Sequence, residues 1–599
     1  MSLTKVRNSM IQGAWFNALD YGAVGDGSTN NKAALQAAID AMSAGDTLFI
    51  PNASSYYVVD ATNLLEAVQV NKSINLVIDG EMRSTTVVTQ SLPPAIFFVT
   101  ADNVNFSGSG KLKGPGTYLF DNCPTDHWTS LIRFDYADNV SIDGLQFADG
   151  PRGGLTFYGC NFLSVTNCTF SGGPLADDAV GLGFNNANIF CSNGGKNWII
   201  SGNIFQYDEA TGGAAIQGIQ NSTNVLPELW TVTNNVFANP GQHGTYLYIN
   251  NSVISNNVFR YTTVSALHGS ALKMGGDYNS ITGNTIFDAN GGIGLVSGRY
   301  NVISQNTLED CGGVGIAIYN NTAISWGLDG NEISSNYIGG DGNTAFQGIR
   351  IRFNTTYGTD HGGKNNKIIN NTVVNYGSDS DEIYSSIAIY RSGGSVNFTN
   401  NVISGNTITE SRGNGIALNG VSHSDVSDNL FYNNTDLIFK AIYVDYVDNI
   451  TVQSNLAQDF QGSPTLSELL FSTANSSNIA VDDNFCYGAT GAAPIPQNPT
   501  RNIIGTGNRL SYTDNLRGTF TMNNVAFLVV SNENILDASL TNGNSSIVIV
   551  PLNAAAATAM GSAKSLYVSA KVAKTSFTVT TADGASLPAS DHIFSYYIF

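Results

Sequence analysis

Hydrophobic and polar residues alternate in short segments between residues 200 and 510, and most segments end in one recurring phrase. The phrase consists of an aliphatic residue, Ser or Thr, any residue, Asn, any residue and a hydrophobe. The clearest copies carry Asn203, Asn235, Asn257, Asn284, Asn306, Asn336 and Asn406, and looser copies carry Asn371, Asn429, Asn455, Asn484 and Asn508. Neighbouring copies lie 22 residues (235 to 257) to 35 residues (336 to 371) apart, a period typical of a solenoid.

The alternation before each Asn predicts a short strand, because side chains alternate between the two faces of a strand. The Asn then supplies a turn, since Asn enters the left-handed backbone region more easily than most residues. We therefore expect an all-β fold, a right-handed single-stranded parallel β-helix. In this fold Asn257, Asn284 and Asn306 should stack in one turn, each side chain bonding its neighbour's backbone.

The two ends of the chain have other patterns. Gly25-Asp26-Gly27 predicts a turn before a helix whose apolar face holds Leu35, Ala38, Ile39 and Met42. Such a helix can cap the open end of a solenoid. After Phe520, short aliphatic runs separated by turns predict antiparallel strands in a small β-sandwich. We thus expect a connector at 1–14, an N-terminal cap at 15–94, the β-helix at 95–510 and a C-terminal β-rich domain at 511–599.

Composition excludes several classes of protein. The net charge of -20 makes nucleic acid a poor partner. No apolar run approaches the ~18 residues of a membrane-spanning helix, so we expect no membrane insertion, and the first ten residues lack the core of a signal peptide. Six cysteines without a Cys-x-x-Cys pair favour buried free thiols over disulfides or zinc: Cys123, Cys160, Cys168, Cys191, Cys311 and Cys486.

The segment from Phe16 through Gly25-Asp26-Gly27-Ser-Thr-Asn30-Asn31 to the Ala-rich helix resembles the start of the pectate-lyase-like superfamily of β-helix proteins, common in bacteriophage tailspikes. Asn30 and Asn31 stand where two aspartates are typical, and the resemblance covers about the first 50 residues. It implies a homotrimeric spike, held together by the C-terminal domain and joined to a phage tail or other virion protein. Such a spike binds and depolymerises a bacterial surface polysaccharide, capsule or lipopolysaccharide O-antigen, at the host cell surface.

A second strand in each coil precedes the Asn phrase, and its outward positions lie between inward aliphatic residues. Stacked coils should gather these outward residues into one column of aromatic and cationic side chains. Tyr rings stack on sugars, and Lys or Arg pairs with sugar carboxylates. The column, with a neighbouring histidine, predicts a polysaccharide groove made of Tyr246, Tyr248, Lys273, His268, Tyr319, Arg350, Arg352 and Tyr390.

Two reactions compete for this groove. β-Elimination at an acidic sugar needs a base and a cation that stabilises the developing negative charge. His243, Tyr246 or Tyr248 would be the base, and Lys273 with Arg299 would neutralise the carboxylate. We prefer this lyase reaction.

Hydrolysis by an endo-glycosidase instead needs two carboxyl groups roughly 5–10 Å apart. Asp288 and Glu309 occupy similar turn positions in successive coils and are the candidate pair. A non-catalytic carbohydrate-binding adhesin is the third alternative. We expect no cofactor and no metal, and Asp379-Ser-Asp381-Glu382 fits a solvated loop better than a Ca²⁺ site.

Overall fold

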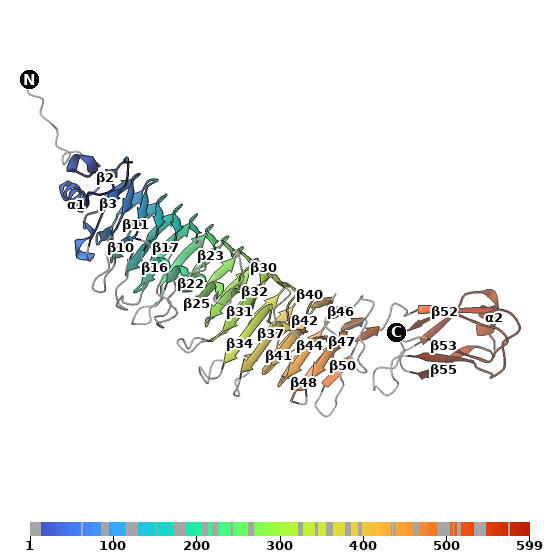
Figure 1. Ribbon diagram of the computed structural model, residues 1–599. Helices are drawn as coiled ribbons and strands as arrows, with labels where there is room; N and C mark the ends of the chain where they lie inside the picture. Colours follow the sequence, from blue (N-terminus) through green and yellow to red (C-terminus); the bar gives the residue numbers. More distant parts are fainter. Residues whose placement is uncertain are drawn as a thin grey trace, which may run out of the picture. The chain divides into compact units, whose positions relative to one another are not determined.

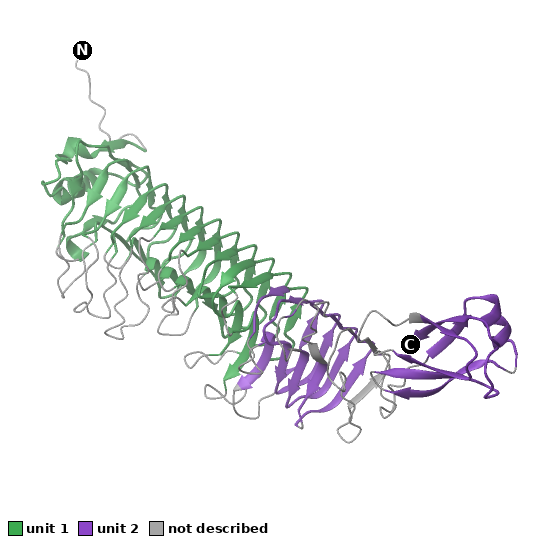
Figure 2. Cartoon of the chain, turned by 45° about the vertical axis from the view of Figure 1, so that its right-hand side comes forward, with its two compact units in different colours: residues 1–371, 392–396 green, residues 372–391, 397–599 purple. Residues whose placement is uncertain are grey.

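The computed structural model describes most of the chain in separate segments. They are residues 13–61, 64–85, 95–115, 130–150, 153–172, 187–206, 214–218, 226–240, 243–261, 269–320, 327–341, 346–354, 363–377, 385–392, 398–432, 434, 439–458, 466–473, 475–487, 503–506, 508–511, 517–531, 547–562, 564–572 and 575–598. The chain divides into two compact units (Figure 2). Unit 1 holds residues 1–371 and 392–396, and unit 2 holds residues 372–391 and 397–599.

Unit 1 is a right-handed parallel β-helix in which each coil contributes strands to three parallel sheets (Figure 1). Sheet A runs from β1 (Trp15–Asn17) and β2 (Thr47–Ile50) to β29 (Val302–Ser304), β32 (Glu332–Ser334) and β35 (Lys367–Ile369). Sheet B runs from β3 (Tyr57–Val58) to β27 (Thr285–Phe287), β30 (Thr307–Cys311) and β33 (Tyr337–Gly340). The predicted fold class is confirmed.

Sheet C of unit 1 carries most of the predicted groove. Its strands are β4 (Val68–Val70), β7 (Phe97–Val99), β10 (Ile132–Asp135), β13 (Leu155–Tyr158), β16 (Ala187–Ser192), β19 (Ala214–Gly218), β22 (His243–Tyr248), β25 (Ser270–Gly275), β28 (Gly291–Val296), β31 (Ile316–Tyr319) and β34 (Ile349–Asn354). Ile216, Leu272, Ile293 and Ile349 are fully buried, because these inward aliphatic residues fill the interior of the coils.

The predicted Asn stack is confirmed. In unit 1, each Asn from Asn203 to Asn336 donates both its backbone N–H and its side-chain N–H to the Oδ1 of the next Asn, ending at Asn371. For Asn257 and Asn284 the distances are 3.1 and 3.0 Å. Because Oδ1 and Nδ2 of these Asn side chains are both hydrogen-bonded, their burial leaves no polar group without a partner.

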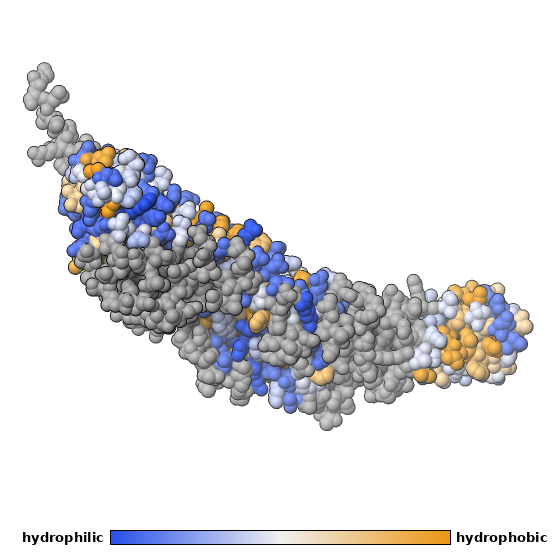
Figure 3. All heavy atoms as spheres, viewed as in Figure 1, coloured by the Kyte–Doolittle hydropathy of each residue, from blue (hydrophilic) through white to orange (hydrophobic). Residues whose placement is uncertain are grey.

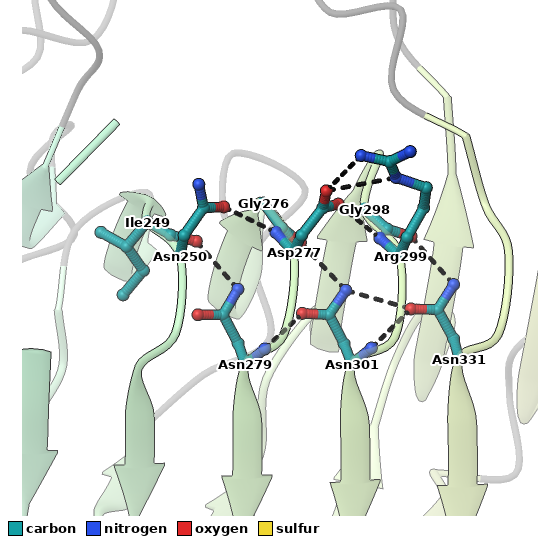
Figure 4. A network of polar contacts seen from close by, with 9 residues as sticks. All are labelled: Ile249, Asn250, Gly276, Asp277, Asn279, Gly298, Arg299, Asn301 and Asn331. Carbon is teal, nitrogen blue, oxygen red and sulfur yellow. Dashed lines mark hydrogen bonds and ion pairs between the residues drawn. The ribbon is translucent and has the colours of Figure 1, made fainter. Parts of the chain in front are cut away.

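A second Asn ladder occupies another turn and was not predicted. The backbone N–H of Asn279 donates to Oδ1 of Asn301, and Asn301 and Asn331 each donate their backbone and side-chain N–H to the next Asn, ending at Asn366 (Figure 4 shows the first three). Each of these residues lies five positions before an Asn of the first ladder, as 279 is to 284. This fixed offset was the available signal in the sequence.

The N-terminal cap contains α1 (Lys32–Ala41), whose Leu35, Ala38 and Ile39 are buried as predicted. Asn31 is also buried, and its Nδ2 donates to the carbonyls of Thr29 and Val58 at 2.7 and 3.2 Å. An ionised aspartate cannot donate these bonds, so an amide suits this position.

Unit 2 contains further strands of the three parallel sheets. Its sheet C strands are β37 (Ser385–Ser392), β41 (Asn414–Asn419), β44 (Phe439–Asp445) and β47 (Leu466–Ser472). An Asn ladder also joins Asn406, Asn429, Asn455, Asn484 and Asn508. The coils of this unit therefore use the same turn chemistry.

The C-terminal part of unit 2 contains two three-stranded antiparallel sheets. One has the order β52 (Arg517–Met522), β57 (His592–Ile598), β54 (Ile547–Pro551), and the other β53 (Phe527–Ser531), β56 (Ser576–Thr581), β55 (Leu566–Val572). They share a core that includes Met522, Phe577, Val579 and Phe594, together with α2 (Ala554–Met560). The predicted sandwich-like fold is confirmed, whereas α2 was not predicted.

Five of the six cysteines are free and buried, as predicted, and Cys123 lies outside the described residues. Among the described residues, no helix is long and apolar enough to cross a membrane. The part of the chain that the structure describes holds no cluster of three metal-ligating side chains. The loop Asp379–Glu382 lies outside that part.

Candidate active site on the outer face of sheet C

Three polar side chains lie side by side on the outer face of sheet C. The parallel register pairs Gln217 with Tyr246 and Tyr246 with Lys273, in strands β19, β22 and β25. Inward Leu247 and Met274 follow Tyr246 and Lys273, so these two side chains point out of the coil. Adjacent strands are roughly 4.8 Å apart, which brings the three residues into one row.

His243 lies beside this row at the start of β22. Its ring stacks on Tyr246 with centroids 5.5 Å apart, and Nδ1 lies 2.8 Å from the carbonyl oxygen of Ser270. A carbonyl only accepts hydrogen bonds, so Nδ1 carries the proton and Nε2 of the neutral ring keeps its lone pair. Nε2 is buried and has no hydrogen-bond partner among the described residues.

Burial, and next the charge of Lys273, lower the pKa of His243 from 6.5 to about 3. The ring is therefore neutral at neutral pH. Lys273 is half-buried, and its Nζ lies 4.7 Å from the centroid of the Tyr246 ring. Burial also lowers the pKa of Lys273, and a nearby anion would offset this effect. His243, Tyr246 and Lys273 thus form one contact group.

Tyr248 and Tyr319 correct the prediction of an open aromatic column. Tyr248 is only 7% exposed and packs with Leu226 and Val296, and its hydroxyl bonds that of Tyr246 at 3.2 Å. Burial raises the pKa of both Tyr248 and Tyr319, which makes them poor bases. The strand alternation placed Tyr248 outside the coil, but outside the coil is not the same as exposed to solvent.

Arg299 does not join this cluster, which corrects its predicted role. It lies in the turn between β28 and β29, where its Nε and Nη2 bond Oδ2 of Asp277 at 3.2 and 2.6 Å (Figure 4). Lys273 is paired with Gly294, and five further residues lead to Arg299, roughly 15 Å of extended chain. Its charge is therefore balanced by Asp277, away from the row.

The remaining predicted binding residues are divided between several places. Arg350 and Arg352 are half-buried on β34, and Nε of Arg350 has no partner among the described residues. Gly294 and Ala317 stand between Lys273 and Arg350 in the register, so this stretch has no long side chain. Tyr390 belongs to unit 2 and is only 6% exposed. The prediction that it is accessible is therefore wrong, because a side chain outside the coil can still be covered, as Tyr248 is. His268 lies outside the described residues.

The carboxyl pair of the hydrolase alternative lies on sheet B. Phe287 is paired with Glu309, and the N–H of Asp288 donates to the carbonyl of Glu309 at 3.1 Å. The predicted proximity of their backbones in successive coils is thus observed. Asp288 has a φ of 55° at a turn position where Asn239 and Asn375 are also left-handed. This turn geometry accounts for Asp288 without catalysis.

Gln217 was missed by the sequence reasoning. It is 1% exposed, and neither Oε1 nor Nε2 has a hydrogen-bond partner among the described residues. Leaving both groups of a buried amide unpaired is costly, and a ligand that bonds them would remove the cost. The available signal was Ala-Ile-Gln217-Gly, in which an inward aliphatic residue precedes an outward polar one, as in Ala-Leu-Lys273-Met.

Comparisons with known proteins agree with this fold. Residues 15–258 match the family "Rhamnogalacturonase A/epimerase, pectate lyase-like", and residues 187–356 match "Right handed beta helix region". Each match covers less than half of the chain, so the chain is similar to these two β-helix families over the matched residues. No curated protein matches the chain.

Similar solved structures come from proteins of different function. PfbA, a surface adhesin of Streptococcus pneumoniae, is 17% identical over 71% of this chain and 91% of its own, with a TM-score of 0.44. A mutant tailspike of E. coli bacteriophage HK620 in complex with a pentasaccharide is 12% identical over 97% of this chain and 93% of its own, with a TM-score of 0.47. A family 28 exopolygalacturonase of Yersinia enterocolitica is 11% identical over 73% of this chain and 78% of its own, with a TM-score of 0.37. These scores are too low to indicate a shared activity.

The buried His243 should make the fold sensitive to acid. The unfolded chain binds a proton at this residue below pH 6.5, whereas the folded chain does so only near pH 3. The free energy of unfolding should therefore fall as the pH drops from 6.5 towards 3. We expect His243→Gln to make this fall shallower in urea titrations at several pH values. His423→Asn, a change at an exposed histidine, is the control and should leave the slope unchanged.

Proposed function

We propose that the protein binds and depolymerises an acidic bacterial surface polysaccharide on the outer face of sheet C, by β-elimination. The contact of half-buried Tyr246 with the cation Lys273, beside the neutral ring of His243, is the observation that carries this proposal. A tyrosine oxygen next to a cation can act as a base. The cation next to it matches the negative charge of a uronic acid.

In the proposed reaction, the side-chain oxygen of Tyr246 takes the proton from C5 of the uronic acid. The C5 electron pair forms the C4–C5 double bond, and the C4–O bond breaks as the leaving oxygen takes that proton from Tyr246. Lys273 neutralises the carboxylate and so stabilises the negative charge that develops during proton removal. His243 is buried and has a pKa of about 3, so its neutral ring stacks beside Tyr246 and positions it.

The test is the ultraviolet absorbance of the unsaturated product. A panel of purified acidic capsules and lipopolysaccharides should contain a polymer whose incubation with the protein raises this absorbance. Cleavage without the absorbance would favour the hydrolase, with Asp288 and Glu309 as its carboxyl pair. Binding without any cleavage would favour the adhesin.

We further infer that the protein acts as a homotrimeric phage tailspike at the bacterial cell surface. The cap motif around Gly25-Asp26-Gly27 supports this, through its resemblance to tailspikes. Apolar residues exposed on the C-terminal sheets also support it, because such patches usually mark interfaces (Figure 3). They are Phe527, Val529, Val548, Val550, Leu552, Tyr567, Val572, Ile593 and Tyr597, each at least 36% exposed.

Removal of the C-terminal domain should abolish the trimer. We expect a chain truncated after Arg509 to have the mass of one subunit by light scattering, whereas the full chain has the mass of three. Phe527→Thr with Val529→Thr, at side chains that are 61% and 53% exposed, should shift the same equilibrium without removing the fold. A trimer that persists in the truncated chain would refute this assignment.

A further inference from the structure

A column of left-handed turn residues runs along unit 1 next to the second Asn ladder. In successive coils it contains Leu229, Asn251, Tyr278, Tyr300, Gly330 and Asn365, with φ between 51° and 67°. Backbone bonds connect the coils at this column, for example from the N–H of Tyr278 to the carbonyl of Arg299 at 2.9 Å. Gly and Asn suit this conformation, whereas a bulky ring is strained in it. Two adjacent tyrosines are thus not explained by the turn itself.

The rings of Tyr278 and Tyr300 form an exposed stack. Their centroids are 5.1 Å apart with an interplanar angle of 14°, and the residues are 58% and 49% exposed. This spacing is close to the distance between coils, so the ring faces point along the helix axis. Tyr300 covers Gly330, where an added Cβ would lie 2.5 Å from Cδ1 of the ring. On the other side, the coil before Tyr278 carries the short polar side chain of Asn251 in the same column.

Polar groups next to the stack are fixed in place (Figure 4). Asp277 holds Arg299 by the side-chain bonds described above, and its Oδ1 accepts the backbone N–H of Arg299 at 2.8 Å. The N–H of Asp277 in turn donates to Oδ1 of Asn250 at 2.7 Å. The pair carries no net charge, and the Arg299 side chain remains 44% exposed.

We propose that Tyr278, Tyr300 and Arg299 form a second saccharide-binding site, in the turn between sheets C and A, for neutral pyranose units of a polysaccharide. The apolar face of a pyranose stacks on the outer face of Tyr278, since aromatic rings bury such faces well. Arg299 and Asn251 donate hydrogen bonds to its hydroxyl groups. Because Asp277 balances Arg299, this site favours neutral sugars, unlike the site around Lys273. It requires neither His243 nor Lys273 and holds the polymer without cleaving it.

The test replaces both tyrosines by Asn, the residue that the column carries at positions 251 and 365. In Tyr278→Asn/Tyr300→Asn, the left-handed turns are retained, so the melting temperature should be equal or higher. Leu229→Asn is the matched control, because it makes the same change at a non-aromatic residue that is 47% exposed. Affinity electrophoresis through gels containing dextran, glucomannan or a purified neutral O-antigen measures the Kd for each polymer.

We expect at least one of these polymers to retard the unmodified protein. The double variant should bind about tenfold more weakly, as expected for loss of a stacked ring, while Leu229→Asn binds normally. Equal retardation of the double variant and the unmodified protein would overturn the proposal, as would no retardation by any of the three polymers. Retardation that only Lys273→Ala abolishes would place all binding on sheet C and would also overturn it.

Discussion

Lys273→Ala should lower the turnover of a cleavable acidic polysaccharide by about a hundredfold, roughly the cost of losing one charge-stabilising donor. The reason is that Lys273 is a cation that contacts the Tyr246 ring and whose charge also acts on His243. Folding should be spared, because the side chain points out of the coil between buried Leu272 and Met274. Steady-state rates and the melting temperature of the variant measure the two effects separately.

Lys273→Arg, Asp288→Asn and Glu309→Gln complete this comparison. Lys273→Arg keeps the charge and should retain more activity than the alanine variant. Under the lyase reaction, the two carboxyl variants should turn over at the normal rate, and Asn also suits the left-handed backbone of Asp288. Under the hydrolase reaction, either carboxyl variant abolishes activity while Lys273→Ala only weakens binding. Full activity of Lys273→Ala would end the lyase assignment.

The candidate site shows how far strand alternation leads. Alternation was sufficient to place Tyr246 and Lys273 on adjacent coils facing outward, because the inward aliphatic residues fix the register. It did not reveal the burial of Tyr248 or Tyr390, since packing outside the coil comes from segments distant in sequence. The pairing of Arg299 with Asp277 likewise depends on a bond across 22 residues. Gln217 was overlooked because a neutral amide has no charge and no acid or base function that would mark it as a site residue.

The fold was easier to predict because its main signals repeat. The first Asn ladder could be predicted since each coil carries the phrase, whereas the second has a weaker local pattern around Asn279 and Asn301. In earlier coils the turn position of the second ladder holds other residues: Ser252 comes before Asn279, and Trp198 and Trp230 stack there with centroids 4.3 Å apart. The residue type therefore changes along this position. Helix α2 was missed because its Ala-rich segment has no apolar periodicity, although Asn553 caps it by accepting from the N–H of Ala556.

The Asn ladder makes single coils energetically dependent on their neighbours. Oδ1 of Asn284 accepts from the backbone N–H and Nδ2 of Asn257, at 3.1 and 3.0 Å. Nδ2 of Asn284 donates to the carbonyl of Ile254 and to Oδ1 of Asn306, both at 3.0 Å. Asn284 is fully buried, so water cannot replace these partners when they are lost. A substitution here therefore affects the coil before it and the coil after it.

Asn284→Leu should lower the free energy of unfolding by roughly 2–6 kcal/mol, because two buried donors of Asn257 lose their acceptor at about 1–3 kcal/mol each. Urea unfolding followed by circular dichroism measures this loss. Asn256→Gly is the matched control, since Asn256 is exposed in the same turn with a φ of 55°, which glycine adopts freely. The control should stay within about 1 kcal/mol of the unmodified protein. If Asn284→Leu unfolds at the same urea concentration as this control, the ladder contributes nothing beyond the strands that it connects.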